Sequence, residues 1–306
     1  MVGIKDQAFG LELEFSGITR QKAAEAIAPV LGGTAYYKGG AYKAYAVKAA
    51  DGREWLVERD ASVTPINGGQ RCEFVTPKCE YSDIETVQEC IRTLRKAGAK
   101  VNTSCGLHIH VDAANHTAKS LKNLAFTFRA KEDLIFRAVK TQSSRLGQWC
   151  KPISDDLINR IKEIRKLDDN ALQDAWYSTY ANSWESRSAH YNTSRYHALN
   201  LHSVFYRGTV EFRLFEATLH AGEVRAYINL CLAMSAQAIN AKRASAEPLD
   251  NGNDKYAMRC WLLRLGFIGD EWKVVREHLM KNLTGNAAWR NDPNTYESYR
   301  QRQHSA

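Results

Sequence analysis

The sequence lacks the motifs of several large protein classes. It has no GxxxxGK[ST] phosphate loop and no GxGxxG after a strand, so neither a P-loop nor a doubly wound nucleotide-binding fold is expected. It also has no HExxH motif of the helical zinc sites. No run of about 18 apolar residues is present, and no charged-then-apolar signal opens the chain. We therefore expect a cytoplasmic protein that does not enter a membrane.

Cysteines are present, but their spacing indicates no disulfide framework. The seven cysteines contain no CxxC pair, which also argues against a zinc–thiolate site. Cys105 lies three residues before His108, so a nucleophilic thiol is one interpretation. A small, half-buried thiol in a glycine turn is the favoured one.

Length and charge set the remaining bounds. A chain of 306 residues with 44% hydrophobic residues can bury a sizeable core. We predict a single catalytic domain over 1–285, with a helical insertion near 142–197, and a polar, flexible tail over 286–306. The net charge of +8 favours anionic partners such as nucleotides or nucleic acid. The basic residues are scattered, so a solvated basic surface is the simpler explanation.

Hydrophobic periodicity predicts an α+β fold. Alternation and turn residues predict strands near 8–15, 34–37, 42–48, 54–59, 71–77, 99–112, 198–205 and 208–216, the last two as a hairpin around Arg207-Gly208. Helical spacing predicts helices near 20–31, 82–96, 118–140, 222–242, 255–265 and 270–282. We expect a mostly antiparallel, curved sheet with a polar, metal-binding concave face and helices on its convex face.

Three of these strands carry paired ionisable residues. Successive side chains of a strand point to opposite faces, so each i, i+2 pair lies on one face and the apolar residues lie on the other. The pairs are Glu12 and Glu14, His108 and His110, and Glu211 and Arg213. Several carboxylates on one face are unfavourable unless cations neutralise them, and Glu, Asp and His are common ligands of divalent metals. A metal site is therefore the leading hypothesis.

Four stretches together resemble the amidoligase family, the carboxylate–amine ligases related to glutamate–cysteine ligase and glutamine synthetase. They are FGLELEF at 9–15, RDAS at 59–62 with CEFVTP at 72–77, CGLHIHVD at 105–112, and ALNL at 198–201 with GTVEFRLFEATL at 208–219. The resemblance implies a half-open antiparallel sheet, like the glutamine synthetase catalytic domain. It also implies ATP and two or three Mg²⁺ ions, or Mn²⁺ in their place.

The resemblance further implies roles for individual residues. The implied metal ligands are Glu12, Glu14, Asp60, Glu73, His108 and Glu211, with Glu58 as an alternative to Asp60. Arg213, beside Glu211, would clamp a phosphate or carboxylate in catalysis, with Arg195 and Arg71 as secondary candidates. His110 would bind the nucleotide or hydrogen bond to a ligand. Asn200 would orient substrate or stabilise a turn.

Three functions follow, and the sequence leaves the choice open. The first is an ATP-dependent ligase that joins a small-molecule or peptide carboxylate to an amine through an acyl-phosphate. Glu216 and Asp112 are candidate general bases, although a regular strand would point Glu216 away from Glu211. The second is a metal-dependent hydrolase or phosphoesterase. The third is a nucleic-acid-binding module that uses the basic, aromatic segment 142–197.

Overall fold

One antiparallel sheet organises the protein. The computed structural model describes residues 1–248 and 252–290. Within these ranges, the strands pair in the order β2-β3-β4-β5-β1-β6-β8-β7 and form a curved, unclosed sheet, which confirms the expected α+β class. The likeness to glutamine synthetase stays a prediction. The strands are β1 (Phe9–Phe15), β2 (Thr34–Gly39), β3 (Ala44–Lys48), β4 (Glu54–Glu58), β5 (Cys72–Val75), β6 (Gly106–Asp112), β7 (Leu199–Asn200) and β8 (Thr209–Glu216).

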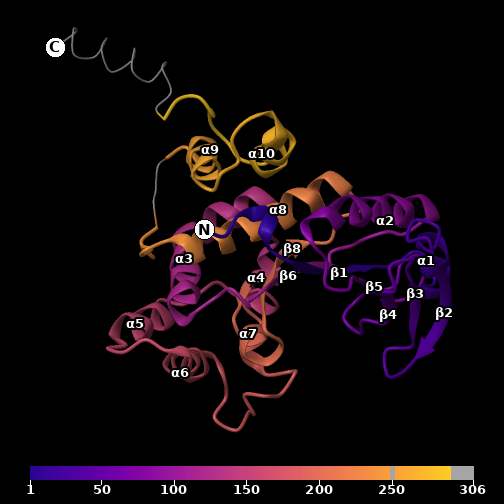
Figure 1. Cartoon of the computed structure of the whole chain (residues 1–306), viewed down its shortest axis with the longest axis horizontal. Coiled ribbons are helices and arrows are strands. Elements are labelled where there is room, and N and C mark those ends of the chain that lie inside the picture. Colours follow the sequence, from indigo (N-terminus) through magenta and orange to yellow (C-terminus); the bar gives the residue numbers. More distant parts are fainter. Residues whose placement is uncertain (249–251, 291–306) are drawn as a thin grey trace.

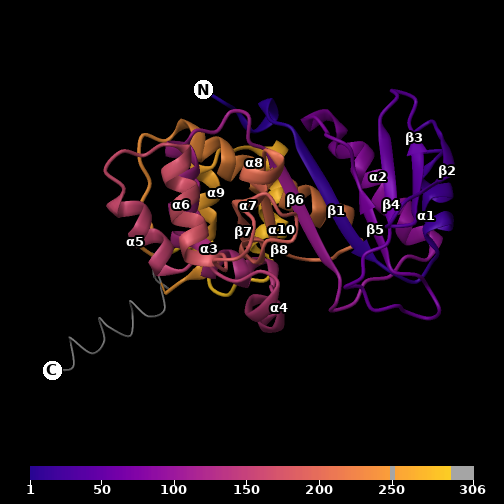
Figure 2. The ribbon, with the colours of Figure 1, turned by 90° about the horizontal axis from the view of Figure 1, so that it is seen from below.

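Helices cover one side of the sheet in two layers. Figure 1 shows α2 and α8 along one side of the sheet, with α9 and α10 beyond α8 and α4 and α7 on the other side. Figure 2 views the molecule from below, with strands β1 to β6 drawn openly in front. The helices are α1 (Arg20–Ile27), α2 (Ile84–Ala97), α3 (Ala118–Val139), α4 (Ser143–Gln148), α5 (Asp155–Glu163), α6 (Asp169–Tyr180), α7 (His202–Arg207), α8 (Ala221–Asn240), α9 (Asp254–Arg264) and α10 (Lys273–Met280).

Strand β1 shows why the sheet has two unlike faces. Phe9, Leu11, Leu13 and Phe15 alternate along it and are fully buried in the hydrophobic core. The intervening residues point to the other face, where the glutamates lie. Helix α8 is apolar on most sides because it packs against α2, α3 and α10. The core therefore lies between sheet and helices, and the opposite face is left for polar side chains.

Two predicted strands are wrong in extent. The strand expected over 198–205 pairs with β8 only at Leu199–Asn200, and α7 follows at once, so no tight hairpin forms around Arg207-Gly208. Leu201, Val204 and Phe205 have helical spacing, and Gly208 ends the helix at a φ of 75°, in the left-handed region. The strand expected over 99–112 begins at Gly106, because the residues before it form a turn in which the Asn102 side chain accepts from the Ser104 N–H.

The segment predicted as a helical insertion, 142–197, contains α4, α5 and α6. The division into a domain over 1–285 and a tail stays a prediction. Residues 291–306, most of the predicted tail, lie outside the described residues. Among the described helices, none is long and apolar enough to span a bilayer.

Candidate functional site

The register of the central strands places the predicted ionisable residues side by side. Paired residues on neighbouring antiparallel strands share a face, so their side chains meet. Across the sheet, from β4 to β7, these residues form one polar row. Its register pairs are Glu58–Glu73, Glu73–Glu14, Glu12–His108, His110–Glu211 and Glu211–Asn200. Six strands, several of them distant in sequence, therefore contribute to one polar surface.

Three overlapping groups on this surface have the spacing of a cation site. In each group, one nitrogen or oxygen atom per residue lies within 4.8 Å of the others. The groups are Glu12 with His110 and Glu211, Glu12 with Glu73 and His108, and Glu14 with Asp60 and Glu73. All six predicted metal ligands belong to at least one group. The structure brings them together, while their role as ligands stays a prediction.

One half of the surface is ionised. Burial opposes the charge of Glu12, but His110 and His108 hold the pKa of its carboxyl well below the ordinary value. Burial also opposes the charge of Glu211, yet Arg213 and the two histidines lower its pKa to about 2. Arg213 donates a short hydrogen bond from Nη1 to Glu211 Oε1. Glu12 and Glu211 are therefore carboxylates at neutral pH, held by neighbouring cations and imidazoles.

The other half resists ionisation. Burial, and then the charges of Glu12 and Glu14, raise the pKa of Glu73 well above its ordinary value. Burial and the nearby Asp60 raise the pKa of Glu14 to about 7, although its Oε2 accepts a 2.6 Å hydrogen bond from the Gly106 N–H. Without a bound cation, burial and the neighbouring acids therefore favour the protonated form of both groups. A divalent cation would supply the charge that these two groups lack.

A cavity of about 740 Å³ opens over this surface. Its floor is the carboxylate surface, and two walls come from distant parts of the chain. The first wall contains Ala41, Tyr42, Arg59, Asp60, Ala61, Ser62, Thr103 and Ser104; the second contains Arg145, Trp149, His190, Tyr191, Arg195, Tyr196 and Arg207. The walls meet where the Tyr42 and Tyr191 hydroxyls hydrogen bond at 2.8 Å. The volume is in the range of small-molecule sites.

The predicted cofactor-binding residues divide into two kinds. Arg195 lines the cavity, as expected for a residue that meets a ligand. Arg71 instead donates from Nη1 to the Ala61 carbonyl at 2.6 Å, so it supports the loop that forms the first wall. Asn200 donates from Nδ2 to Glu211 Oε2 at 2.6 Å. His110 Nδ1 lies 3.1 Å from the Thr209 hydroxyl. Asn200 and His110 are thus placed to orient Glu211 and Glu12.

The sequence did not predict Arg145, a residue of the second wall, as part of the site. Arg145 is buried and donates from Nη2 to the Arg213 carbonyl at 3.2 Å, and its Nε lies 3.5 Å from Glu216. It sits against Gly106, where a side chain would collide with it. An arginine in a polar helical segment gives no local signal of this placement. Gly106, at the start of the strand that carries His108 and His110, was the available sign that another group approaches the backbone closely.

Arg207 also lies at the site, although the sequence predicts it in a turn. Its Nη1 lies 3.4 Å from Glu12 Oε1, and its Nη2 lies 2.8 Å from His190 Nε2. It is the last residue of α7, the helix that replaced the predicted hairpin. A hairpin turn would have placed Arg207 beyond the end of the sheet. The incorrect prediction of a hairpin therefore gave no reason to expect Arg207 near the carboxylates.

The minor candidates are also placed. Cys105 is fully buried, and burial raises the pKa of its thiol, which favours the packing interpretation over the nucleophile. Asp112 is paired with Lys78 at 2.5 Å. The register between β6 and β8 shifts by one residue, so Glu216 pairs with Gly106 and lies on the same face of the sheet as Glu211. A regular strand would have placed Glu216 on the opposite face. Glu216 accepts from the Gln142 N–H at 3.0 Å.

Two observations test whether the site suits a divalent cation. His110 Nε2 lies 3.3 Å from Glu12 Oε1 and 3.9 Å from Glu211 Oε1, but it makes no good hydrogen bond within the described part of the chain. A buried polar atom without a partner is costly, and an ion would satisfy it. The second observation is the raised pKa of Glu73 described above. Oxygen-rich donors with imidazole suit Mg²⁺ or Mn²⁺, so the residues present fit the expected ions.

The fold and the site together define a class: an α+β protein whose open antiparallel sheet carries a buried row of carboxylates and imidazoles under a basic cavity wall. Comparison with known families agrees with this class. The family model described as "Putative amidoligase enzyme" matches residues 5–235, which include every site residue named above. The chain therefore belongs to this amidoligase family. A search of curated proteins finds no match.

Proposed function

We propose that this protein is an ATP- and Mg²⁺-dependent carboxylate–amine ligase that forms an amide or isopeptide bond through an acyl-phosphate. Family membership indicates a ligase-type enzyme. The observation that carries the finer proposal is the pairing of carboxylates that resist ionisation with arginines around one cavity. A hydrolase would need the carboxylates, but it would have less use for so many guanidinium groups facing them.

The proposal assigns each side of the cavity a task. Glu12, Glu14, Glu73 and His108, with Asp60 and Glu211, would hold Mg²⁺. When bound, the metal would neutralise the phosphate oxygens at the transferring phosphoryl group. The remaining steps belong to the chain itself.

Arginines of the walls would bind the anionic groups of the substrates. Arg59, Arg195 and Arg207 line the cavity and suit the γ-phosphate or the carboxylate to be activated. Arg213 has a buried Nε without a hydrogen-bond partner in the described part of the chain, so it keeps a donor for a ligand. The Nε of Arg145 instead faces Glu216 at 3.5 Å. The wall contact between Tyr42 and Tyr191 would help to exclude water from the acyl-phosphate, which water would otherwise hydrolyse.

Substrate screening tests the proposal directly. The purified protein, with ATP and Mg²⁺ or Mn²⁺, would be supplied with paired pools of amino acids, peptides and polyamines. We expect ADP release that requires both an acid and an amine, and a product that has lost water. A heavy-oxygen label on the acid should appear in the released phosphate, because the acyl-phosphate transfers one carboxylate oxygen.

Glu14→Gln should abolish this turnover, because the side chain can no longer ionise. Glu25→Gln, on the exposed side of α1, is the matched control and should keep full turnover. Release of AMP would contradict the acyl-phosphate route. Cleavage of substrates without ATP would favour a hydrolase, and salt-sensitive oligonucleotide binding that survives Glu14→Gln, with no turnover, would favour a nucleic-acid-binding module.

A further inference from the structure

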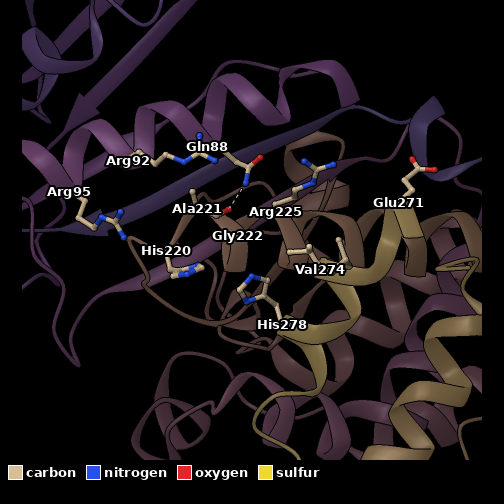
Figure 3. A pocket seen from close by; sticks show the side chains of 11 residues that line it. Gln88, Arg92, Arg95, His220, Ala221, Gly222, Arg225, Glu271, Val274 and His278 are labelled. Atoms are coloured by element: carbon tan, nitrogen blue, oxygen red, sulfur yellow. Dashed lines mark hydrogen bonds between the residues drawn. The ribbon is translucent and has the colours of Figure 1, made fainter. Parts of the chain in front are cut away.

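A second cavity, of about 470 Å³, lies on the helical side of the sheet. Three helices form it: α2, the first turns of α8, and α10. Figure 3 shows Arg92 and Arg95 projecting from α2 on one side and His220 and His278 facing each other on another. The Gln88 side chain donates to the Ala221 carbonyl at 3.0 Å and ties α2 to the start of α8. The carboxylate row lies on the other face of the sheet.

The lining of this cavity has an excess of positive charge. Arg92 forms an ion pair with Glu89, with an N–O distance of 2.9 Å. Arg95 and Arg225 have no carboxylate within ion-pair distance among residues 1–248 and 252–290. The one carboxylate in the lining, Glu271, is already paired with Lys5. Guanidinium groups that surround a shared space repel one another, and an anion placed between them would offset that repulsion.

The two imidazoles are more suited to an anion than to a metal ion. The ring centroids of His220 and His278 lie 5.0 Å apart, and one atom each of His220, Glu223 and His278 lie within 4.8 Å of one another. Glu223, however, already bonds the Thr218 hydroxyl at 2.5 Å and pairs with Lys281. The His220 Nδ1 accepts the backbone N–H of Glu223. A cation would have to displace the Lys281 ammonium in a positive field.

We propose that this cavity binds a small ligand with a phosphate or carboxylate group, held by Arg92, Arg95 and Arg225 with hydrogen bonds from the two imidazoles. The planar fork of arginine matches both oxyanions. Val274 and Val275 provide an apolar side for the rest of the ligand. The volume lies at the lower end of the range for small-molecule sites. The proposal is independent of the ligase chemistry, because it uses none of the residues assigned to the carboxylate row.

The test is a titration of the full chain at constant ionic strength with inorganic phosphate, glycerol 3-phosphate and succinate as separate probes. Calorimetry gives the affinity, and the imidazole resonances of His220 and His278 report where the probe binds. We expect both imidazoles to shift. Arg95→Gln and Arg225→Gln should each weaken binding about tenfold or more, since each removes charge-assisted hydrogen bonds. The stronger probe distinguishes a phosphate site from a carboxylate site.

Lys96→Gln is the matched control, because it removes the same charge from an exposed neighbouring position outside the cavity. It should change affinity less than about twofold. Circular dichroism confirms that each variant is folded. Equal loss in Lys96→Gln would show non-specific attraction and overturn the proposal. So would loss in Arg213→Gln with full binding in Arg95→Gln, or stoichiometric Zn²⁺ uptake that depends on His278 with no binding of any anionic probe.

Discussion

Glu14 is buried and Glu73 is half-buried, and each has other carboxylates as near neighbours. Burial and the surrounding acids raise the pKa values of both, whereas histidines and Arg213 keep Glu12 and Glu211 charged. A row of mixed protonation like this is poorly suited to a purely structural role, because replacement by apolar residues would stabilise the fold more. This cost in stability is what we expect of residues that bind a ligand.

The pKa of Glu14 predicts how stability depends on pH when no divalent cation is present. The unfolded chain releases this proton near pH 4.5, while the folded protein holds it until about pH 7. The folded state thus binds more protons in this window, so Glu14 lowers the free energy of unfolding as the pH rises from about 4.5 to about 7. In the native protein this decrease in the free energy of unfolding amounts to about 3 kcal/mol across that window, and in Glu14→Gln it should be absent.

Urea denaturation in the presence of a chelator, at several pH values, measures this difference between variant and native protein. Glu25→Gln should follow the native curve, since Glu25 is exposed on α1. If the two glutamine variants show the same pH dependence, the raised pKa of Glu14 is wrong.

The same protonation predicts that Mg²⁺ binding releases protons. Cation binding requires Glu14 and Glu73 to ionise, so the affinity should fall as the pH is lowered below about 7. Calorimetry in two buffers with different ionisation enthalpies counts the protons released. We expect at least one proton for each protein molecule near pH 6.5 or below, and a count of zero would contradict the assignment of these ligands.

At the scale of elements, β6, β8 and the short helix α4 form one unit around Gly106. The shifted register of β8 brings Glu216 opposite Gly106, and Arg145 from α4 fills the space beside both. A Cβ at position 106 would lie 2.6 Å from Arg145 Nη2 and 3.1 Å from His108 Nε2. Glycine is therefore required here by close approach.

Gly106→Ala should displace Arg145 and His108 together. We expect a destabilisation of about 1–3 kcal/mol from overpacking, with weaker Mg²⁺ binding. Gly147→Ala, in α4 itself, meets no atom within 4 Å and should instead stabilise the protein by up to about 1 kcal/mol. Thermal unfolding of both variants, followed by Mg²⁺ titration, measures the contrast. An unperturbed Gly106→Ala protein would show that Arg145 does not occupy this space.

For the whole molecule, one continuous hydrophobic cluster joins the strands of the first half to the helices of the second. Phe128 of α3 illustrates this, because its ring packs against Phe136 and against Phe212 of β8. Trp55 in β4 and Trp176 in α6 are buried in the same cluster. The parts of the molecule should therefore unfold together.

Phe128→Ala should lower the free energy of unfolding by about 3–5 kcal/mol. Because the core is shared, tryptophan fluorescence and far-ultraviolet circular dichroism should report the same shifted midpoint in denaturant. Two separate transitions, with only one of them moved, would show that the chain unfolds as independent units and would contradict the predicted single domain.

The sequence by itself determined the sheet faces and most of the carboxylate row. Glu12 and Glu14, and His108 and His110, occur at a spacing of two within apolar strands, and a strand has to place such pairs on one face. The long helices α2, α3 and α8 were predicted closely for the same reason, since their periodicity is local. The order and spacing of the four stretches were enough to indicate the family that the comparison then identified.

Only the tertiary structure decided what surrounds that row. Arg145 and Arg207 reach the carboxylates from α4 and α7, and Arg95 of α2 and Arg225 of α8 line one cavity. The register shift in β8 and the replacement of a predicted strand by α7 are equally non-local, because tertiary packing can override local alternation. Periodicity specifies the direction of a side chain from its own element, whereas its neighbours depend on how elements pack, which no local pattern encodes.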